Sequence, residues 1–195
     1  MKKAGFVALI GEPNAGKSTL LNHFVGSKVS IVTHKVQTTR TKIRGIVIVD
    51  SAQIVFVDTP GLFKPRRRLD RAMVAAAWGG AADADVIVLL IEAHRGLTEG
   101  VERILGDLSN SNKNRPVVLA INKIDKPNSN PDKIKEGLSK MNLLVEDWGG
   151  KIQSHDISAL KGDGVNELLE KEKAGATGIS KISIQTGTSH GGVPL

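Results

Sequence analysis

Apolar residues gather in short, nearly continuous runs along the chain. Three runs of strand length, 6–10, 86–91 and 117–121, are apolar at almost every position. Such runs are typical of strands buried on both faces of a parallel sheet. Two shorter runs, 46–49 and 54–57, flank a brief polar turn. This pair predicts an antiparallel hairpin, so one strand of the sheet should run against the others.

Longer stretches with helical spacing lie between and after these runs, at 17–25, 69–78, 98–108 and 131–141. A last strand and a last helix are predicted at 152–157 and 165–171. Strands that alternate with helices indicate an α/β fold with right-handed crossovers. The pattern therefore predicts a mostly parallel six-stranded sheet with one antiparallel strand and helices on both faces.

Beyond these elements the hydrophobic pattern ends. Residues 174–195 are rich in Gly, Ser and Thr and show no helical period. We interpret them as a disordered tail, with an edge strand at 182–184 as the alternative. The folded domain is predicted to occupy residues 1–173.

Composition narrows the class of protein. The 195 residues suffice for one domain, and the absence of cysteine excludes disulfides and thiolate metal sites. The net charge of +7 is compatible with nucleotides, RNA or acidic membrane surfaces, and equally with a plain basic surface. No apolar run approaches the ~20 residues of a membrane span, and no signal peptide is recognised, so the sequence predicts a cytoplasmic protein.

The first candidate for chemistry is the segment GEPNAGKS at 11–18, which follows a predicted strand and opens a predicted helix. This is the phosphate-binding pattern G-x-x-x-x-G-K-S. Its glycines let backbone N–H groups point at phosphates, and the helix adds its positive end. Lys17 would reach the β- and γ-phosphates, and the Ser18 hydroxyl would bind Mg²⁺. The predicted nucleotide contacts here are Gly11, Asn14, Ala15, Gly16, Lys17, Ser18 and Thr19.

The phosphate loop alone does not distinguish kinases, ATPases and GTPases. The segment DTPG at 58–61 ends the next predicted strand. Asp58 can hold the Mg²⁺ shell through water, and the Gly61 N–H can meet the γ-phosphate. The loop after Gly61 should then respond to hydrolysis.

The segment NKID at 122–125 indicates that the base of the bound nucleotide is guanine. The Asp125 carboxylate can accept from guanine N1–H and the exocyclic amine, a donor pair that adenine lacks. Asn122 can bond the base N7 and brace the phosphate loop, while the stem of Lys123 covers the ring. The segment Ser158, Ala159 and Leu160 should offer a backbone N–H to guanine O6.

A threonine between the phosphate loop and Asp58 normally completes the Mg²⁺ site. We choose Thr39, with Thr38 as the alternative. The predicted metal ligands are then Ser18, Thr39 and Asp58. The predicted catalytic residues are Lys17, Thr39 and Gly61.

From residue 4 to about residue 125 the chain resembles the bacterial Era GTPases. The resemblance rests on GFVALIGEPNAGKSTL, KVSIVTHKVQTTR, IVFVDTPGLFKPRRRLDRAM and ADADVIVLLIEAHRGL. It implies a Ras-like P-loop GTPase domain that binds GTP, GDP and Mg²⁺ and hydrolyses GTP to GDP and phosphate. It also implies a switch linked to maturation of the small (30S) ribosomal subunit and its 16S ribosomal RNA.

The resemblance adds two expectations about the reaction. Many small GTPases place a water-orienting Gln just after D-x-x-G, whereas this chain and Era-like enzymes have a hydrophobic residue there, Leu62. Asn14 occupies the position at which related GTPases hold K⁺, which could take the place of an arginine finger in neutralising transition-state charge.

The back half departs from this resemblance. Residues 121–170 are similar to the G domain of bacterial translation initiation factor 2, with INKIDKPNSNPDKIKEGLSKMNLLVEDWGGKIQSHDISA and GDGVNELLEK as the matching stretches. Era proteins continue into a C-terminal RNA-binding KH domain, which we do not find. We therefore expect a mosaic of an Era-like front half, an initiation-factor-like back half and an unrelated tail, with a natural divergent Era as the alternative.

Rival functions remain open at this point. The chain could be a slow GTPase switch, a guanine-nucleotide-binding module with little turnover, or, with least support, a P-loop kinase or ATPase. A basic run after Gly61 is either a solvated face or a ribosome-facing patch whose position depends on nucleotide. The run comprises Lys64, Arg66, Arg67, Arg68 and Arg71. We expect a monomer, with peripheral membrane contact as a further candidate.

Overall fold

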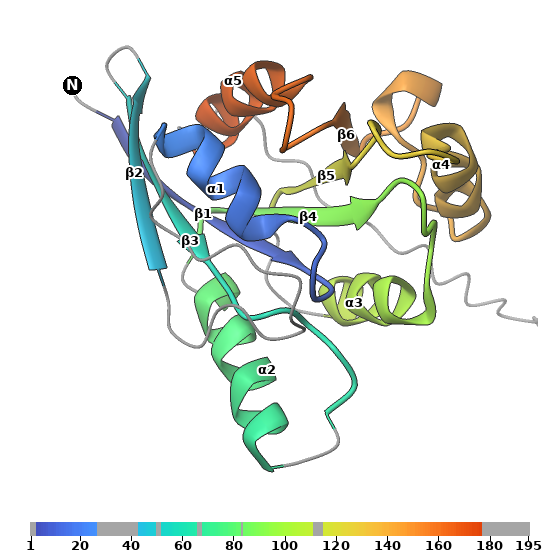
Figure 1. Ribbon diagram of the computed structural model, residues 1–195, viewed down its shortest axis with the longest axis horizontal. Coiled ribbons are helices and arrows are strands. Elements are labelled where there is room, and N and C mark those ends of the chain that lie inside the picture. The colour runs from blue at the N-terminus through green and yellow to red at the C-terminus, as the bar shows by residue number, and fades with distance from the viewer. Residues whose placement is uncertain are drawn as a thin grey trace, which may run out of the picture.

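The computed structural model describes residues 3–26, 43–49, 52–65, 68–82, 84–110 and 115–176. Together they form one three-layer α/β unit (Figure 1). The predicted edge strand at 182–184 and most of the predicted tail lie outside these residues. The last helix extends to Ala176 and so passes the predicted start of the tail at residue 174.

The central sheet has six strands in the order β2-β3-β1-β4-β5-β6. The strands are β1 (Lys3–Gly11), β2 (Ile43–Val49), β3 (Ala52–Asp58), β4 (Val86–Glu92), β5 (Val117–Asn122) and β6 (Gln153–Ile157). Strand β2 pairs antiparallel with β3, and every other pairing is parallel. The predicted hairpin and the mostly parallel six-stranded sheet are therefore confirmed.

The helices cover both faces of this sheet (Figure 1). They are α1 (Lys17–Val25), α2 (Arg68–Ala82), α3 (Glu99–Asn110), α4 (Pro131–Lys140) and α5 (Val165–Ala176), with a short 3-10 turn η1 (Glu146–Trp148) before β6. Helices α1 and α5 pack on one face, and α2, α3 and α4 pack on the other. None of the helices in the described part of the chain is long and apolar enough to cross a membrane.

The two faces of the sheet have separate aliphatic cores. On one face, Ala77 of α2, Ile104 of α3 and Ile134 of α4 pack against alternate residues of β4 and β5. On the other face, Leu20 of α1 and Leu168 of α5 pack against the intervening residues. Because β4 and β5 are buried at every position, their runs are apolar throughout and do not alternate.

Polar residues interrupt this pattern at one edge of the sheet. Strands β1, β3, β4 and β5 end at Gly11, Asp58, Glu92 and Asn122, each one residue beyond the apolar run that predicted the strand. In an open α/β sheet the ligand site lies outside the carboxyl ends of the strands. The fold therefore brings these four residues to one place.

Candidate functional site

The loop between β1 and α1 has a shape that only particular residues allow. Gly11 and Gly16 have φ angles of 148° and 101°, in the region that favours glycine. A Cβ at Gly11 would lie 2.7 Å from the carbonyl oxygen of Leu90, and one at Gly16 would collide with the side-chain amide of Asn122. Asn14 also has a positive φ, of 65°. At its two glycines the loop is thus packed against the ends of β4 and β5 so closely that a side chain would not fit.

Lys17 lies beneath this loop and is buried. Its ammonium donates to the carbonyl oxygens of Gly11 at 3.1 Å and Glu12 at 2.8 Å. Burial lowers the pKa of Lys17 to about 8, while the nearby carboxylates of Asp58, Glu92 and Glu12 act in the opposite direction. The loop therefore holds its positive charge at the start of α1, where the helix dipole adds to it.

Ser18 and Asp58 meet next to Lys17. The Ser18 hydroxyl donates to Asp58 Oδ2 at 2.7 Å, and both side chains are buried. The neighbouring Thr59 hydroxyl donates to the Leu9 carbonyl at 2.6 Å, which fixes β3 beside β1 at this point. A hydroxyl and a carboxylate oxygen are the hard donors that Mg²⁺ prefers, so these residues fit the ion. Thr39, the third predicted ligand, and its alternative Thr38 lie outside the described residues.

The segment after Asp58 packs closely against the phosphate loop. A Cβ at Gly61 would lie 2.7 Å from the backbone of Pro13, so only glycine fits there. The Leu62 N–H donates to the Gly11 carbonyl at 2.9 Å. The Leu62 side chain is 3% exposed and belongs to the core under α2 and α3. Leu62 is therefore a packing residue, and its side chain has no group that could orient water.

Asn122 connects the phosphate loop to the loops predicted to bind the base. Its Nδ2 donates to the Ala15 carbonyl at 2.8 Å. Its Oδ1 accepts from the backbone N–H of Lys123 at 2.8 Å and of Ala159 at 3.0 Å. The side chain is 1% exposed. One buried amide thus fixes three loops relative to one another.

Asp125 and Ser158 form the second contact between the base loops. The Ser158 hydroxyl donates to Asp125 Oδ1 at 2.7 Å. This hydrogen bond lowers the pKa of Asp125 and outweighs the opposing effect of burial, and Lys161 and Lys126 add smaller effects that also lower it. The carboxylate is half-buried and remains ionised, ready to accept hydrogen bonds.

In the segment predicted to meet guanine O6, the backbone N–H groups of Ser158 and Ala159 both donate within the protein. The Ala159 N–H donates to Asn122, as described, whereas the Leu160 side chain is 74% exposed. The Ser158 N–H donates to the Asp163 carbonyl at 2.9 Å. The structure therefore brings these residues to the predicted site, and their contact with the base stays a prediction.

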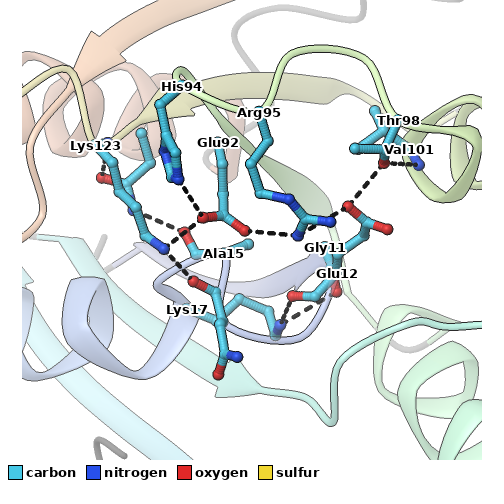
Figure 2. A network of polar contacts seen from close by, with 12 residues as sticks. Gly11, Glu12, Ala15, Lys17, Glu92, His94, Arg95, Thr98, Val101 and Lys123 are labelled. Carbon is cyan, nitrogen blue, oxygen red and sulfur yellow. Dashed lines mark hydrogen bonds and ion pairs between the residues drawn. The ribbon is translucent and has the colours of Figure 1, made fainter. Parts of the chain in front are cut away.

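The sequence did not predict a cluster of charged side chains that adjoins the phosphate loop (Figure 2). Glu92 at the end of β4 contacts Lys123, His94 and Arg95, and Arg95 also approaches Glu12. Glu12 accepts a hydrogen bond from the Thr98 hydroxyl at 2.8 Å. A carboxylate that closes an apolar strand was the signal that could have identified Glu92.

Loops from β1, β3, β5 and β6 thus converge at one edge of a doubly covered sheet, with a phosphate-loop lysine at their centre. This fold and this placement of the loops define a P-loop GTPase domain of the Ras-like type. The chain belongs to the 50S ribosome-binding GTPase family, whose model matches residues 6–123.

The similarity to known proteins extends beyond the segment that the family model matches. The GTPase Era of Dinoroseobacter shibae is 61% identical over 167 residues, which are 85% of this chain and 52% of that protein. The GTPase Era of Rhizobium meliloti is 54% identical over 168 residues, 86% of this chain and 51% of that protein. The chain therefore spans about half the length of these relatives.

Solved structures agree with this assignment of the fold. Era in complex with MgGDPNP and nucleotides 1506–1542 of 16S ribosomal RNA is 39% identical, with a TM-score of 0.78 over 88% of this chain and 56% of that one. An Era variant from Aquifex aeolicus bound to GDP.AlF4- is 38% identical, with a TM-score of 0.79 over 89% of this chain and 57% of that one.

The expected mosaic gains no support from these comparisons. A match of 167 residues is longer than the front segment that ends near residue 125, so it includes part of the back half. The Era likeness and the single continuous sheet both cross the point at which we placed the junction.

Proposed function

We propose that the chain is an Era-type G domain along its whole described length, and that it binds GTP and GDP and hydrolyses GTP to GDP and phosphate. Asn122 is the observation that carries this proposal. Its buried amide holds the phosphate loop, Lys123 and Ala159 together. Hydrogen bonds of this kind are needed where a protein must bind phosphates and a guanine base at a fixed distance from each other. The guanine nucleotides bound in the two solved Era structures support the same site.

The residues suggest a division of roles in this reaction. The loop N–H groups and Lys17 would stabilise charge on the transferred phosphoryl group, and Gly61 would approach it from β3. Ser18 and Asp58, with Thr39, would hold Mg²⁺, which would supply positive charge to the phosphates. Asp125 would read the guanine edge, with Ser158 holding its carboxylate in place.

Single-turnover hydrolysis of GTP, with ATP as the competitor, tests this proposal. We expect conversion of bound GTP to GDP, and no displacement of GTP by an equal concentration of ATP. Equal competition by ATP would contradict the guanine site. Stable binding of GTP with no GDP formed would favour the alternative, a guanine-nucleotide-binding module with little turnover, because Leu62 is buried and cannot orient water.

We also propose K⁺ as an activator at Asn14. The residue has a positive φ, and its side chain is exposed at the mouth of the loop. An oxygen ligand there could hold a monovalent cation beside the phosphates. Hydrolysis should be faster in KCl than in NaCl at equal ionic strength, and Asn14→Ala should remove the difference. Equal rates for the unmodified chain in the two salts would contradict this.

Ribosomal RNA, or the 30S subunit, is the proposed partner. The 16S RNA fragment bound in the Era complex supports it. In this chain Lys64, Arg68 and Arg71 are exposed after Gly61, while Arg66 and Arg67 lie outside the described residues. Binding to 16S RNA fragments should weaken with salt and differ between GDP and GTP states. The expectations of a cytoplasmic monomer and of membrane contact stay predictions.

A further inference from the structure

Glu92 is a buried carboxylate that the nucleotide site described above does not use. It is the last residue of β4 and is 6% exposed. In the sheet its register partner is Asn122, the residue immediately before Lys123. The parallel pairing of β4 and β5 therefore places Glu92 beside the base loops, although thirty residues separate it from Asn122 in the chain.

One oxygen of Glu92 holds the ammonium of Lys123. Lys123 Nζ lies 2.5 Å from Glu92 Oε2 and donates to the carbonyl oxygen of Asn14 at 2.6 Å. The ammonium is thus fixed between β4 and the phosphate loop, and Lys123 itself has a positive φ of 67°. Both ends of this side chain are constrained, so the direction of its stem is determined.

The other oxygen of Glu92 holds Arg95, which turns back to the phosphate loop. Arg95 Nη1 lies 3.1 Å from Glu92 Oε1 and 3.7 Å from Glu12 Oε2. Figure 2 shows Glu12, Arg95, Glu92 and Lys123 joined one after another by these contacts. Because Lys123 also binds the Asn14 carbonyl, the backbone of the phosphate loop closes the series into a ring. His94 also faces Glu92, with Nε2 3.7 Å from Oε2.

The Glu12 side of this ring is fixed to α3. The Thr98 hydroxyl donates to Glu12 Oε2 and accepts from the Val101 N–H at 3.2 Å, which caps the helix. A Cβ at Gly100 would overlap the Glu12 carboxylate, so the glycine leaves space for it. The carboxylate of the phosphate loop is thereby directed to the positive end of a helix.

We propose that Glu92 is a positioning residue for guanine. It holds the stem of Lys123 against the phosphate loop, at the place where the base must lie. This rests on the proposed binding of guanine nucleotides. Without the carboxylate, Lys123 keeps only the Asn14 carbonyl among these contacts, and its stem no longer has a fixed direction. In such a variant the contribution of the base to nucleotide affinity falls, while the contribution of the phosphates does not.

The experiment compares GDP with pyrophosphate, both with Mg²⁺, by calorimetric titration of the full chain. Glu92→Gln should weaken GDP binding about tenfold and change pyrophosphate binding by less than about twofold. Glu102→Gln on α3 is the matched control, because Glu102 is exposed and lies outside the ring. Equal weakening of both ligands would overturn the proposal, since a merely structural ion pair would affect the whole site.

A double-mutant cycle tests whether Glu92 acts through Lys123. In a Lys123→Met background, Glu92→Gln should add less than about twofold to the loss of GDP affinity. Full additivity would overturn the proposal. If Glu92→Gln does not fold, Glu92→Asp serves in its place, with about threefold weaker GDP binding expected because the carboxylate is retained but set back.

The same titrations separate the two proposals. If the unmodified chain does not bind GDP, both the proposed function and the role of Glu92 fail. If it binds GDP in preference to ADP and Glu92→Gln leaves the GDP affinity unchanged, only the role of Glu92 fails.

Discussion

The two halves of the candidate nucleotide site are built by different means. The phosphate half, Gly11 to Ser18 with Asp58, depends on backbone shape, since Cβ atoms at Gly11 and Gly16 would meet other parts of the protein. The base half, Asn122 to Asp125 with Ser158, depends on side chains that hydrogen-bond to backbone N–H groups of the base loops or to one another. The phosphate half should therefore fail completely on substitution, and the base half in graded steps.

The chemistry of the two ligand groups explains this difference. Phosphate oxygens are alike, and backbone N–H groups can bind them from any residue whose main chain has the right shape. A base is recognised by its particular donors and acceptors, which requires side chains of matching type. Asn122 belongs to both halves, because its amide holds Ala15 as well as Ala159.

The largest effect is expected in the phosphate half, from Gly16→Ala. The new Cβ would collide with Asn122, and the φ of 101° is strained for any residue with a side chain. Binding of GDP and binding of pyrophosphate should both weaken at least about a hundredfold, as measured by calorimetric titration.

Gly79→Ala in α2 is the control for this change. A Cβ there meets nothing within 4 Å. Alanine should stabilise the helix by about 0.5–1 kcal/mol and leave nucleotide affinity unchanged. If Gly16→Ala were tolerated equally well, the phosphate half would not depend on backbone shape.

The connection between the halves is tested by Asn122→Ala. The change removes three hydrogen bonds of a buried amide, and we expect the free energy of unfolding to fall by about 2–3 kcal/mol. GDP binding should weaken about thirtyfold and pyrophosphate binding about fivefold, because the phosphate loop also loses its hydrogen bond to Asn122. Chemical denaturation and titration measure the two effects. Loss confined to GDP would show that Asn122 serves the base alone.

The sequence was sufficient to predict the phosphate half because its spacing encodes a backbone shape. It also predicted the strands, since β4 and β5 are buried on both faces and their apolar runs are unbroken. It did not predict the ring through Glu92 and Arg95. A charge after a strand becomes informative only when the sheet register places it beside Asn122.

A smaller effect on the base half is expected from Lys135→Met in α4. Lys135 is buried and binds Asp147 and Asp156, each at 3.0 Å, so it ties α4 to the end of β6 just before Ser158. Burial lowers the pKa of Lys135, yet the two carboxylates outweigh it and the pKa is raised overall. Removing the ammonium leaves two carboxylates facing each other and should cost about 1–2 kcal/mol of stability.

The pH dependence of this contribution follows from the raised pKa. The stabilisation is fully present below the ordinary lysine value of 10.5 and is lost as pH rises through the higher value in the folded protein. Above neutral pH, the stabilities of the unmodified protein and of Lys135→Met should therefore converge only in strong alkali. Lys140→Met, which breaks an exposed pair with Glu136, is the control and should change stability little. A constant difference at all pH values would contradict the ion-pair explanation.

The smallest effect is expected from Ser158→Ala. The change removes the hydrogen bond that lowers the pKa of Asp125, so this pKa rises toward its ordinary value. At neutral pH GDP should weaken only about threefold to fivefold, since Asp125 stays ionised. In a pH series, affinity is present above the pKa of Asp125 and falls as pH drops through it. The fall should begin at a higher pH in the variant, and coincident curves would contradict this.

Guanine selection by Asp125 is the central claim, and a titration of the Asp125→Asn variant with GDP and XDP tests it most directly. An amide at this position offers the xanthine base a donor and no longer accepts from the guanine amine. The preference should invert, with GDP weakened and XDP strengthened, each by at least about tenfold. An unchanged ratio of GDP to XDP affinity would contradict the account, because the base would then be read elsewhere.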